Sequence, residues 1–533
     1  MTTPLRELDL VAADGCLLLG EDSGVTYLDG AEQLVGALVD EASDLGSLSD
    51  ELHYAATTWP ERYHLERGRA NVLRALDLPA GATVLEIGAG CGAISRYVGE
   101  RVAALDAVEP VAARARVAAS RTRDLPGVRV FVGTLDDVPD APAYDLVLVI
   151  GVLEYVGGGT ADEQVYADFL ASVRRRLNPG GSLVLAIENQ LGVKYLAGAP
   201  EDHSGRPWDG PEGYPNGAPA RTFARRPLEA LLGRAGFTST RTLGCFPDYK
   251  ITRVVLGDDL AARHPRLLTE LPRFPSPDWG FDGSRPADEA KLWRELTAAG
   301  LSGEMWNSFL VVAGVGEPDA LWPDDRLAVY FNTDRAARWC TRAEVLADRI
   351  RRSPLVEQGG DVVSVRAYEE PVHDGVPLLE VVAREPWRAE EMLLAWRDVL
   401  HSGHGAELGP AAWDLVPHNL LVTADGLRAI DLEWQVADLT LTQVEQRGLL
   451  LTADHLARAG WRGAGERTTV RDLAGWFGVL LGHSPSYVEQ AAELEACFQA
   501  TRVVGSSTGA GLRREQDYLR AAWRTRLDEP VAG

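Results

Sequence analysis

A glycine-rich turn carries the strongest chemical signal in the sequence. Residues 84–87, Val-Leu-Glu-Ile, read as a short strand, and Gly-Ala-Gly-Cys-Gly follows directly at positions 88–92, before a helical pattern. Glycines at a strand-to-helix turn adopt backbone conformations closed to other residues and let a ligand approach the main chain. In an open α/β sheet such a turn lies at the carboxyl ends of the strands, where ligands bind. Alone, the pattern also fits an ordinary tight turn, so the residues at the neighbouring strand ends are needed to distinguish a ligand site from such a turn.

The next three strand patterns also end in groups that suit a nucleoside. Glu109 ends the second, where a carboxylate can accept hydrogen bonds from two ribose hydroxyls. Residues 133–136 follow the third, where an adenine would fit, and residues 150–155 follow the fourth. A dinucleotide-binding fold would instead place Gly-x-Gly-x-x-Gly after its first strand. The observed spacing, Gly-x-Gly-x-Gly with an acidic residue inside the preceding strand, argues against that alternative.

These residues resemble the class I S-adenosyl-L-methionine (SAM)-dependent methyltransferases, whose pattern at the first strand is Glu/Asp-x-Gly-x-Gly. The resemblance rests on residues 84–92, Glu109, Asp136 and residues 145–155. It implies a Rossmann-like domain with SAM as the cofactor, its methionine moiety beside the glycine-rich turn, its ribose beside Glu109 and its adenine after the third strand. The cofactor-binding residues expected on this basis are Glu86, Gly88, Ala89, Gly90, Gly92, Glu109, Thr134, Leu135, Asp136 and Gly151.

Polar and aromatic residues gather in segments outside the glycine-rich turn. The chain reads Trp-Pro-Glu-Arg-Tyr-His-Leu at 59–65, and similar segments occur at 187–195 and 246–250. Two of the three lysines of the chain lie in these segments, and lysine presents a compact point charge that arginine does not. A surface helix with solvated charges is the alternative for residues 59–65. The residues expected to contact the methyl acceptor are Tyr63, Asn189, Lys194, Tyr195, Arg221, Asp248, Tyr249 and Lys250.

Methyl transfer is a displacement at the sulfonium methyl, in which the protein orients the reactants and excludes water. A neutral hydroxyl or ammonium acceptor also needs a general base. His203 is the first candidate because an imidazole is partly charged near neutral pH, and His64 and Glu188 are the other catalytic candidates. A carboxylate acceptor would need no base. An exposed loop histidine is the alternative for His203, and no metal site is expected.

Longer segments between residues 59 and 315 resemble a bacterial methyltransferase subfamily found with glycan and secondary-metabolite pathways. They include E-I-G-A-G-C-G-A-I-S-R-Y at 86–97, E-N-Q-L-G-V-K-Y at 188–195 and F-P-D-Y-K at 246–250. The resemblance implies a role in secondary metabolism such as antibiotic biosynthesis. We predict O-methylation of a hydroxyl or carboxyl on a sugar-like, nucleoside or other small molecule. An N-methyltransferase, a bifunctional methyltransferase and kinase, and a non-catalytic SAM-binding scaffold are the alternatives.

The C-terminal third carries a second pattern. Asp414, four intervening residues and Asn419 reproduce the spacing of a kinase catalytic loop, and Asp431 follows at the position of a metal-binding aspartate. The segment resembles aminoglycoside-phosphotransferase-like kinases, which implies Asp414 as base and the other two residues as Mg²⁺ ligands. Ala412 stands where the loop usually has histidine, and no lysine follows Lys291. We therefore expect a kinase-like scaffolding, dimerising or acceptor-presenting domain without phosphoryl transfer, with an active kinase as the alternative.

Alternating strand and helix patterns after residue 83 predict a parallel sheet covered by helices on both faces. The expected fold class is α/β, with a Rossmann-like methyltransferase domain and a smaller α+β kinase-like C-terminal domain. We expect an N-terminal α+β segment over residues 1–58 and the methyltransferase domain over 59–318, with a substrate-loop insertion at about 198–221. The C-terminal domain is expected over residues 325–533.

Composition narrows the set of partners. The net charge of −25 would repel a phosphate polyanion, so nucleic-acid binding is not expected. The five cysteines lack paired spacing, which fits a reducing cytoplasm. The sequence shows no pattern of a signal peptide and no apolar run long enough for a membrane span. We expect a cytoplasmic enzyme whose partner is a small-molecule substrate, with any homo-oligomer forming through the C-terminal domain.

Overall fold

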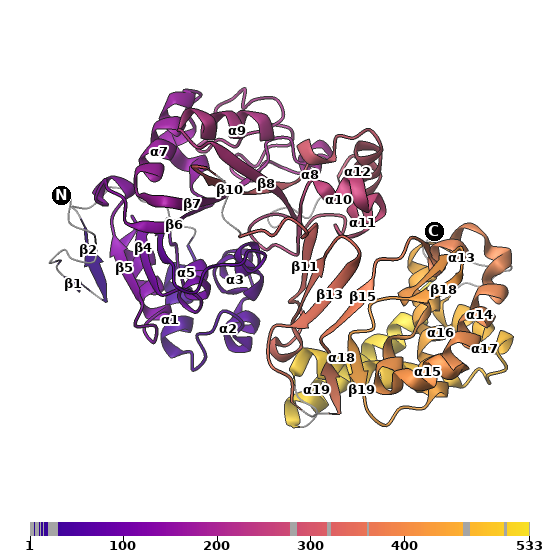
Figure 1. The fold of residues 1–533 in the computed structure, drawn as a ribbon. Coiled ribbons are helices and arrows are strands. Elements are labelled where there is room, and N and C mark those ends of the chain that lie inside the picture. Colours follow the sequence, from indigo (N-terminus) through magenta and orange to yellow (C-terminus); the bar gives the residue numbers. More distant parts are fainter. Residues whose placement is uncertain are drawn as a thin grey trace. The chain divides into compact units, whose positions relative to one another are not determined.

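The computed structural model describes residues 5, 10, 12–13, 15–19, 30–277, 285–316, 321–359, 362–461, 469–505 and 509–531. The chain divides into two compact units (Figure 1). The first comprises Met1–Phe331 with Glu344–Ala347, and the second comprises Asn332–Ala343 with Asp348–Gly533. Each unit buries a hydrophobic core of its own.

A mixed sheet forms the centre of the first unit, and its parallel part has the order β2-β5-β4-β3-β6-β7. The antiparallel strands β10, β8, β9 and β11 continue the sheet beyond β7. The bounds are β2 (Cys16–Leu18), β3 (Thr83–Ile87), β4 (Ala104–Glu109), β5 (Val128–Val132), β6 (Tyr144–Ile150), β7 (Leu177–Glu188), β8 (Ser239–Phe246), β9 (Val254–Leu256), β10 (Ser308–Gly314) and β11 (Ala328–Asn332). The predicted Rossmann-like sheet is therefore confirmed, and its strand order reverses between β3 and β6, the place where such sheets bind ligands.

Helices cover both faces of this sheet, because each connection between parallel strands must cross over one face. Figure 1 shows α7 and α9 on one side of the strands, and α1, α3 and α5 on the other. The helices of the first unit are α1 (Glu32–Glu41), α2 (Asp50–Ala55), α3 (Trp59–Leu65), α4 (Asn71–Arg74), α5 (Ala93–Gly99), α6 (Ala112–Arg121), α7 (Glu163–Arg175), α8 (Val193–Leu196), α9 (Arg225–Arg234), α10 (Asp259–Arg263), α11 (Pro265–Glu270) and α12 (Glu289–Ala298). Buried side chains of α4, α5 and α6 share one core with apolar strand residues such as Val84, Leu148 and Val184.

The segment before β3 is built from short helices. A capping box between Thr58 and Glu61 starts α3, and Glu66 ends it in an extended conformation. The chain then turns through Arg67–Ala70 into α4. Two strands of the predicted N-terminal segment are present, β1 (Ala12–Ala13) and β2, whereas its residues 1–4, 6–9 and 20–29 lie outside the described residues.

The second unit combines antiparallel strands with a bundle of helices. The strands are β13 (Arg349–Pro354) paired with β15 (Tyr368–Pro371), β14 (Val363–Val365) paired with β19 (Trp434–Val436), and the sheet of β16 (Val376–Pro377), β17 (Leu420–Thr423) and β18 (Gly426–Ala429). The helices are α13 (Leu378–Arg384), α14 (Ala389–His401), α15 (Gly403–Leu408), α16 (Leu441–Arg458), α17 (Val470–Leu480), α18 (Tyr487–Val504) and α19 (Ala510–Leu527). Among the described helices of both units, none has the length and apolar character needed to cross a membrane.

Candidate active site

A cavity of about 520 Å³ lies at the carboxyl ends of β3, β4, β5 and β6. Its opposite wall comes from α3 and the turn after it, through Tyr63, His64 and Arg69. Because four strand ends meet here, residues far apart in the sequence share one site, which we call the donor cavity. The predicted cofactor residues that line it are Glu86, Gly88, Ala89, Gly90, Glu109, Thr134, Leu135, Asp136 and Gly151.

The three glycines of the turn have different physical roles, although all have positive φ. A Cβ on Gly90 would meet no described atom within 4 Å, so this glycine opens space at the cavity wall. A Cβ on Gly88 would lie 2.4 Å from Cγ2 of Val152, and one on Gly92 would lie 2.7 Å from Cα of Ala118. Gly92 lies outside the set of described cavity-lining residues. The structure thus places it at the packing of the turn against α6 and not against the predicted cofactor.

Two buried carboxylates give the donor cavity its electrostatic character. Glu86 accepts a hydrogen bond of 2.6 Å from the Ser95 hydroxyl, and burial raises its pKa to about 8. Glu109 accepts hydrogen bonds from the backbone N–H groups of Gly90 and Val111, at 2.8 and 3.0 Å, and burial raises its pKa as well. Buried acids of this kind favour a bound positive charge. SAM carries a sulfonium and an ammonium group, so the residues of the cavity fit this cofactor.

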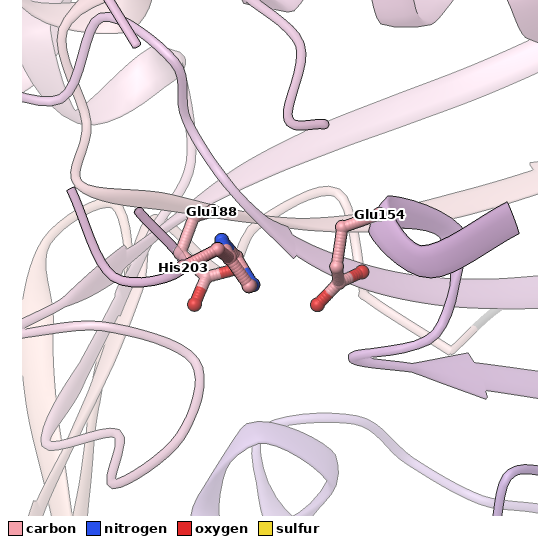
Figure 2. A group of neighbouring side chains, drawn as sticks. All are labelled: Glu154, Glu188 and His203. Carbon is pink, nitrogen blue, oxygen red and sulfur yellow. The ribbon is translucent and has the colours of Figure 1, made fainter. Parts of the chain in front are cut away.

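A second group of polar side chains lies beyond Tyr155, which lines the donor cavity. The ring of Tyr155 packs edge-on against the His203 ring, with centroids 5.3 Å apart. His203 is joined there by Glu154, which follows β6, and by Glu188, which ends β7 (Figure 2). One ligand atom of each side chain in this set lies within 4.8 Å of the other two. We call Glu154, Glu188 and His203 the acceptor-side cluster.

Four further side chains hold the acceptor-side cluster in place. The Nδ1 atom of His203 lies 2.9 Å from Oε1 of Glu201, and the Tyr249 hydroxyl donates to Glu154 at 3.1 Å. The Lys250 ammonium contacts Glu188 and lies 2.6 Å from Asp202. Burial lowers the pKa of Lys250 to about 7 and raises that of Glu154. Predicted catalytic and acceptor residues from separate segments are therefore brought together here.

Lys194 extends this network, because its ammonium lies 3.0 Å from the same Asp202 carboxylate. The Tyr195 ring lies beneath that ammonium at 4.8 Å, and its hydroxyl is buried without a hydrogen-bond partner among the described residues. Arg221 stacks on the Tyr214 ring at 5.4 Å, while its backbone N–H donates to the Glu154 carbonyl at 2.7 Å. Lys194 and Tyr195 are therefore connected to the cluster through Asp202, and Arg221 through the Glu154 backbone.

Two predicted acceptor residues are engaged by the main chain. The Asn189 amide donates to the carbonyls of Glu304 and Trp306, at 2.8 and 2.6 Å, and its oxygen accepts from a neighbouring backbone N–H. Asp248 accepts from the backbone N–H groups of Lys250 and Ile251. Both side chains thus satisfy backbone groups, Asn189 across a long sequence separation and Asp248 locally. His64 is 2% exposed and lines the donor cavity, as does Tyr63, so these two predicted residues lie at the donor cavity and not in the acceptor-side cluster.

Sequence reasoning missed three members of this site, Glu154, Glu201 and Asp202. Glu154 belongs to the segment after β6 that was expected near the cofactor, but nothing in its spacing connects it with His203. Glu201 is two residues from His203, and that short spacing was the available signal because neighbouring loop side chains often bond one another.

The three kinase-like residues of the second unit lie close together, but each side chain already has a hydrogen-bond or ion-pair partner within the protein. Asp414 is buried and accepts a 2.7 Å hydrogen bond from the Trp434 N–H. The Asn419 amide donates to the Asp414 carbonyl at 3.0 Å. Asp431 adopts φ 59° and lies 2.9 Å from the guanidinium of Arg352. An arginine thus holds the aspartate that the pattern assigned to a metal ion.

Comparison with known proteins identifies the class of the first unit. Residues 85–183 match a family model described as a methyltransferase domain. The match begins within β3 and ends within β7, so it spans all four strand ends of the donor cavity. The chain is thus an enzyme of the SAM-dependent methyltransferase class, and SAM is its cofactor.

Similar solved structures include a SAM-dependent methyltransferase from Thermotoga maritima, with 18% identity over 47% of this chain and 88% of that chain and a TM-score of 0.28. Another is a SAM-dependent methyltransferase from Mesorhizobium loti, with 18% identity over 46% of this chain and 97% of that chain and a TM-score of 0.27. A third is phosphoethanolamine N-methyltransferase 1 from Haemonchus contortus, with 16% identity over 31% of this chain and 35% of that chain and a TM-score of 0.23. These likenesses are too distant to bear on the acceptor. No curated protein matches the sequence.

Proposed function

We propose that the first unit transfers the methyl group of SAM to a hydroxyl of a small molecule that is sugar-like, nucleoside-like or another secondary metabolite. The observation that carries this proposal is the acceptor-side cluster, which lies against Tyr155 at the border of the donor cavity. A hydroxyl oxygen becomes a good nucleophile only when its proton is lost, and this cluster combines basic groups in a largely buried place. A carboxyl or an amine acceptor is the alternative.

Different residues are proposed to act at the donor cavity and at the acceptor-side cluster. Bound SAM supplies an activated methyl group. Glu86 favours its positive charge, Glu109 lies where the family resemblance places the ribose, and the open space at Gly90 admits the cofactor to the turn. Tyr155 lines the donor cavity and packs against His203, so it lies between the cofactor side and the acceptor-side cluster. Glu154 and Glu188 are buried, which limits the water that could compete with the acceptor.

The second unit is proposed to be a kinase-like module without phosphoryl transfer. The internal hydrogen bonds of Asp414 and the pairing of Asp431 with Arg352 support this proposal, because a catalytic base and a metal ligand must be available to substrate. Association of two chains through this unit and a cytoplasmic location are also proposals. The proposed absence of nucleic-acid partners is supported by the acidic charge of the chain.

A panel of hydroxylated, carboxylated and amine-bearing small molecules tests the proposed reaction. The full chain is incubated with SAM and each compound, and S-adenosylhomocysteine formation and product mass are measured. We expect a product heavier by one methylene with a hydroxylated compound. The variant His203→Asn should lose at least about 10²-fold in rate while it keeps wild-type affinity for S-adenosylhomocysteine. Turnover of amines alone would replace the hydroxyl with a nitrogen acceptor.

A further inference from the structure

The acceptor-side cluster has the donor set of a divalent-metal site. Its three ligand atoms lie within 4.8 Å of one another, and Figure 2 shows the Glu154 carboxylate across from the His203 and Glu188 side chains, which overlap in this view. Two carboxylate oxygens and one imidazole nitrogen suit a divalent cation such as Mn²⁺ or Mg²⁺. Three ligands evenly spaced at about 2.1 Å from one ion lie about 3.6 Å apart. Atoms separated by up to 4.8 Å therefore need to draw together by about 1.2 Å to share one ion.

Each carboxylate of the cluster keeps a buried oxygen that the protein does not satisfy. Glu154 and Glu188 are both 0% exposed. The Oε2 atom of each has no hydrogen-bond partner among the described residues, although Oε1 of each is bonded. A buried carboxylate oxygen without a partner is costly, so native proteins rarely retain one without a ligand. Two such oxygens in one cluster indicate a positively charged ligand that the chain itself does not supply.

The histidine of the cluster is arranged as metal-binding histidines usually are. Its Nδ1 atom is bonded to the Glu201 carboxylate, which leaves Nε2 as the nitrogen with a free lone pair. Glu201 itself is 1% exposed and accepts the backbone N–H groups of His203 and Ser204, so its orientation is fixed. A carboxylate behind the imidazole sets the tautomer and raises the basicity of the ligating nitrogen.

The charges around the cluster leave room for a dication. With all groups ionised and the imidazole neutral, the four carboxylates and two ammonium groups of the connected side chains carry two net negative charges. Lys250 contacts Glu188 through Oε1 and lies beside Asp202, so it neutralises part of this charge without using Oε2 of Glu188. The members of the network are Glu154, Glu188, Glu201, Asp202, Lys194, Lys250 and His203.

We propose that Glu154, Glu188 and His203 bind one divalent cation of the Mn²⁺ or Mg²⁺ type, which activates the acceptor hydroxyl. The use of the ion in catalysis rests on the proposed function, whereas its binding does not. The acceptor O–H bond breaks and its proton passes to solvent, because the ion stabilises the resulting alkoxide. The O–CH₃ bond then forms as the S–CH₃ bond of SAM breaks, leaving S-adenosylhomocysteine. In this arrangement His203 is a ligand and not the proton acceptor expected from the sequence.

Binding of Mn²⁺ to the chelator-treated full chain tests the site directly. The electron paramagnetic resonance signal of free Mn²⁺ is measured as the chain is titrated, and its decrease should correspond to one bound ion per chain. Excess Mg²⁺ should displace that ion. Glu188→Gln, Glu154→Gln and His203→Asn should each weaken binding at least tenfold, and Glu201→Gln should weaken it about 10- to 100-fold. Glu212→Gln is the matched control, because Glu212 is an exposed glutamate of the same loop and should bind Mn²⁺ normally. Wild-type affinity for S-adenosylhomocysteine verifies that each variant is folded.

The outcomes separate this inference from the proposed function. Absence of Mn²⁺ binding in a chain that binds S-adenosylhomocysteine overturns the metal site and leaves methyl transfer intact. Mn²⁺ binding that persists in all three ligand variants places the ion elsewhere and also overturns it. Stoichiometric binding without turnover of any acceptor supports the metal site and contradicts the proposed reaction. Methyl transfer that is lost with chelator and restored by Mn²⁺ or Mg²⁺, but not by Ca²⁺, supports both.

Discussion

The imidazole of His203 and the carboxylate of Glu201 form a bonded pair, with Nδ1 2.9 Å from Oε1. Both side chains are almost fully buried, at 6% and 1% exposure. The pair raises the pKa of His203 against the opposing effect of burial, and lowers that of Glu201. Glu201 thereby determines which imidazole nitrogen faces the rest of the acceptor-side cluster, whatever that nitrogen goes on to bind.

Replacement of Glu201 by glutamine should reveal this positioning role. The amide keeps the size of the side chain but loses the charge that holds the imidazole tautomer. We expect kcat to fall by about 10- to 100-fold, with little change in the affinity for S-adenosylhomocysteine, measured by calorimetry. Glu212→Gln in the same loop should leave kcat unchanged. An equal loss of cofactor affinity in Glu201→Gln would show instead that the loop as a whole had moved.

Gly90 is expected to control access to the donor cavity. A valine there would place branched carbons in the space that now opens at the turn, so S-adenosylhomocysteine binding should fall below detection. The control is Gly180→Val, because Gly180 also has positive φ and open space where a Cβ would lie, but is exposed and outside the cavity lining. Both variants carry a backbone strain of about 1 kcal/mol, so they should lose similar thermal stability. Normal binding by Gly90→Val would move the cofactor away from this turn.

The raised pKa of Glu86 makes cofactor affinity depend on pH. Burial lifts this pKa from 4.5 to about 8, so the acid is mostly protonated at pH 7 when the cavity holds no cation. The ammonium group of S-adenosylhomocysteine favours the ionised form, if the methionine moiety lies beside Glu86 as the family resemblance implies. Affinity should therefore rise roughly fivefold between pH 7 and pH 8, in proportion to the ionised fraction.

Glu86→Gln provides the test, because glutamine retains the hydrogen bond with Ser95 but does not titrate in this range. Its affinity should be weaker and nearly constant between pH 7 and pH 8. The stability of the unliganded protein should change in the opposite direction. Because the folded-state pKa of Glu86 is raised, its contribution to the free energy of unfolding is full below about pH 4.5 and is lost as the pH rises to about 8. A wild-type affinity without pH dependence would argue that Glu86 stays protonated in the complex.

The sequence predicted the donor cavity well because its residues are local to strand ends. Each strand places its last residues at the same sheet edge, so the turn at Gly88, the carboxylate of Glu109 and the segment at Thr134 converge without further information. Gly92 was the exception. A glycine is needed at this position because α6 approaches the turn closely, and the local sequence pattern does not encode that contact.

The acceptor-side cluster could be predicted only in part. It depends on the path of the loop after β7, which brings His203 back to Glu154, and loop paths are not set by periodicity. Asn189 and Asp248 have the residue types of binding groups, but the structure uses both to satisfy backbone groups. Polar residues in segments without regular structure commonly serve that purpose, so residue type alone does not separate the two roles.

Asp414 provides a test of whether the second unit transfers phosphoryl groups. Its side chain is buried, burial raises its pKa well above the ordinary value, and its Oδ2 accepts the Trp434 N–H. Asp414→Ala should therefore lower the free energy of unfolding of this unit by about 1–3 kcal/mol, because a buried N–H loses its partner. Denaturant unfolding measures this loss, and Asp425→Ala, at an exposed turn, should have almost none.

Catalytic assays complete the test of the second unit. Methyl transfer by folded Asp414→Ala should match the wild type, and calorimetry with ATP and Mg²⁺ should show no binding to either protein. An active kinase predicts the reverse: wild-type chain would bind ATP and phosphorylate a small molecule, and the substitution would abolish phosphorylation while Asp425→Ala retained it. Since Arg352 already pairs with Asp431, a gain of Mg²⁺ binding in Arg352→Ala would further indicate that the arginine has taken the place of the metal ion.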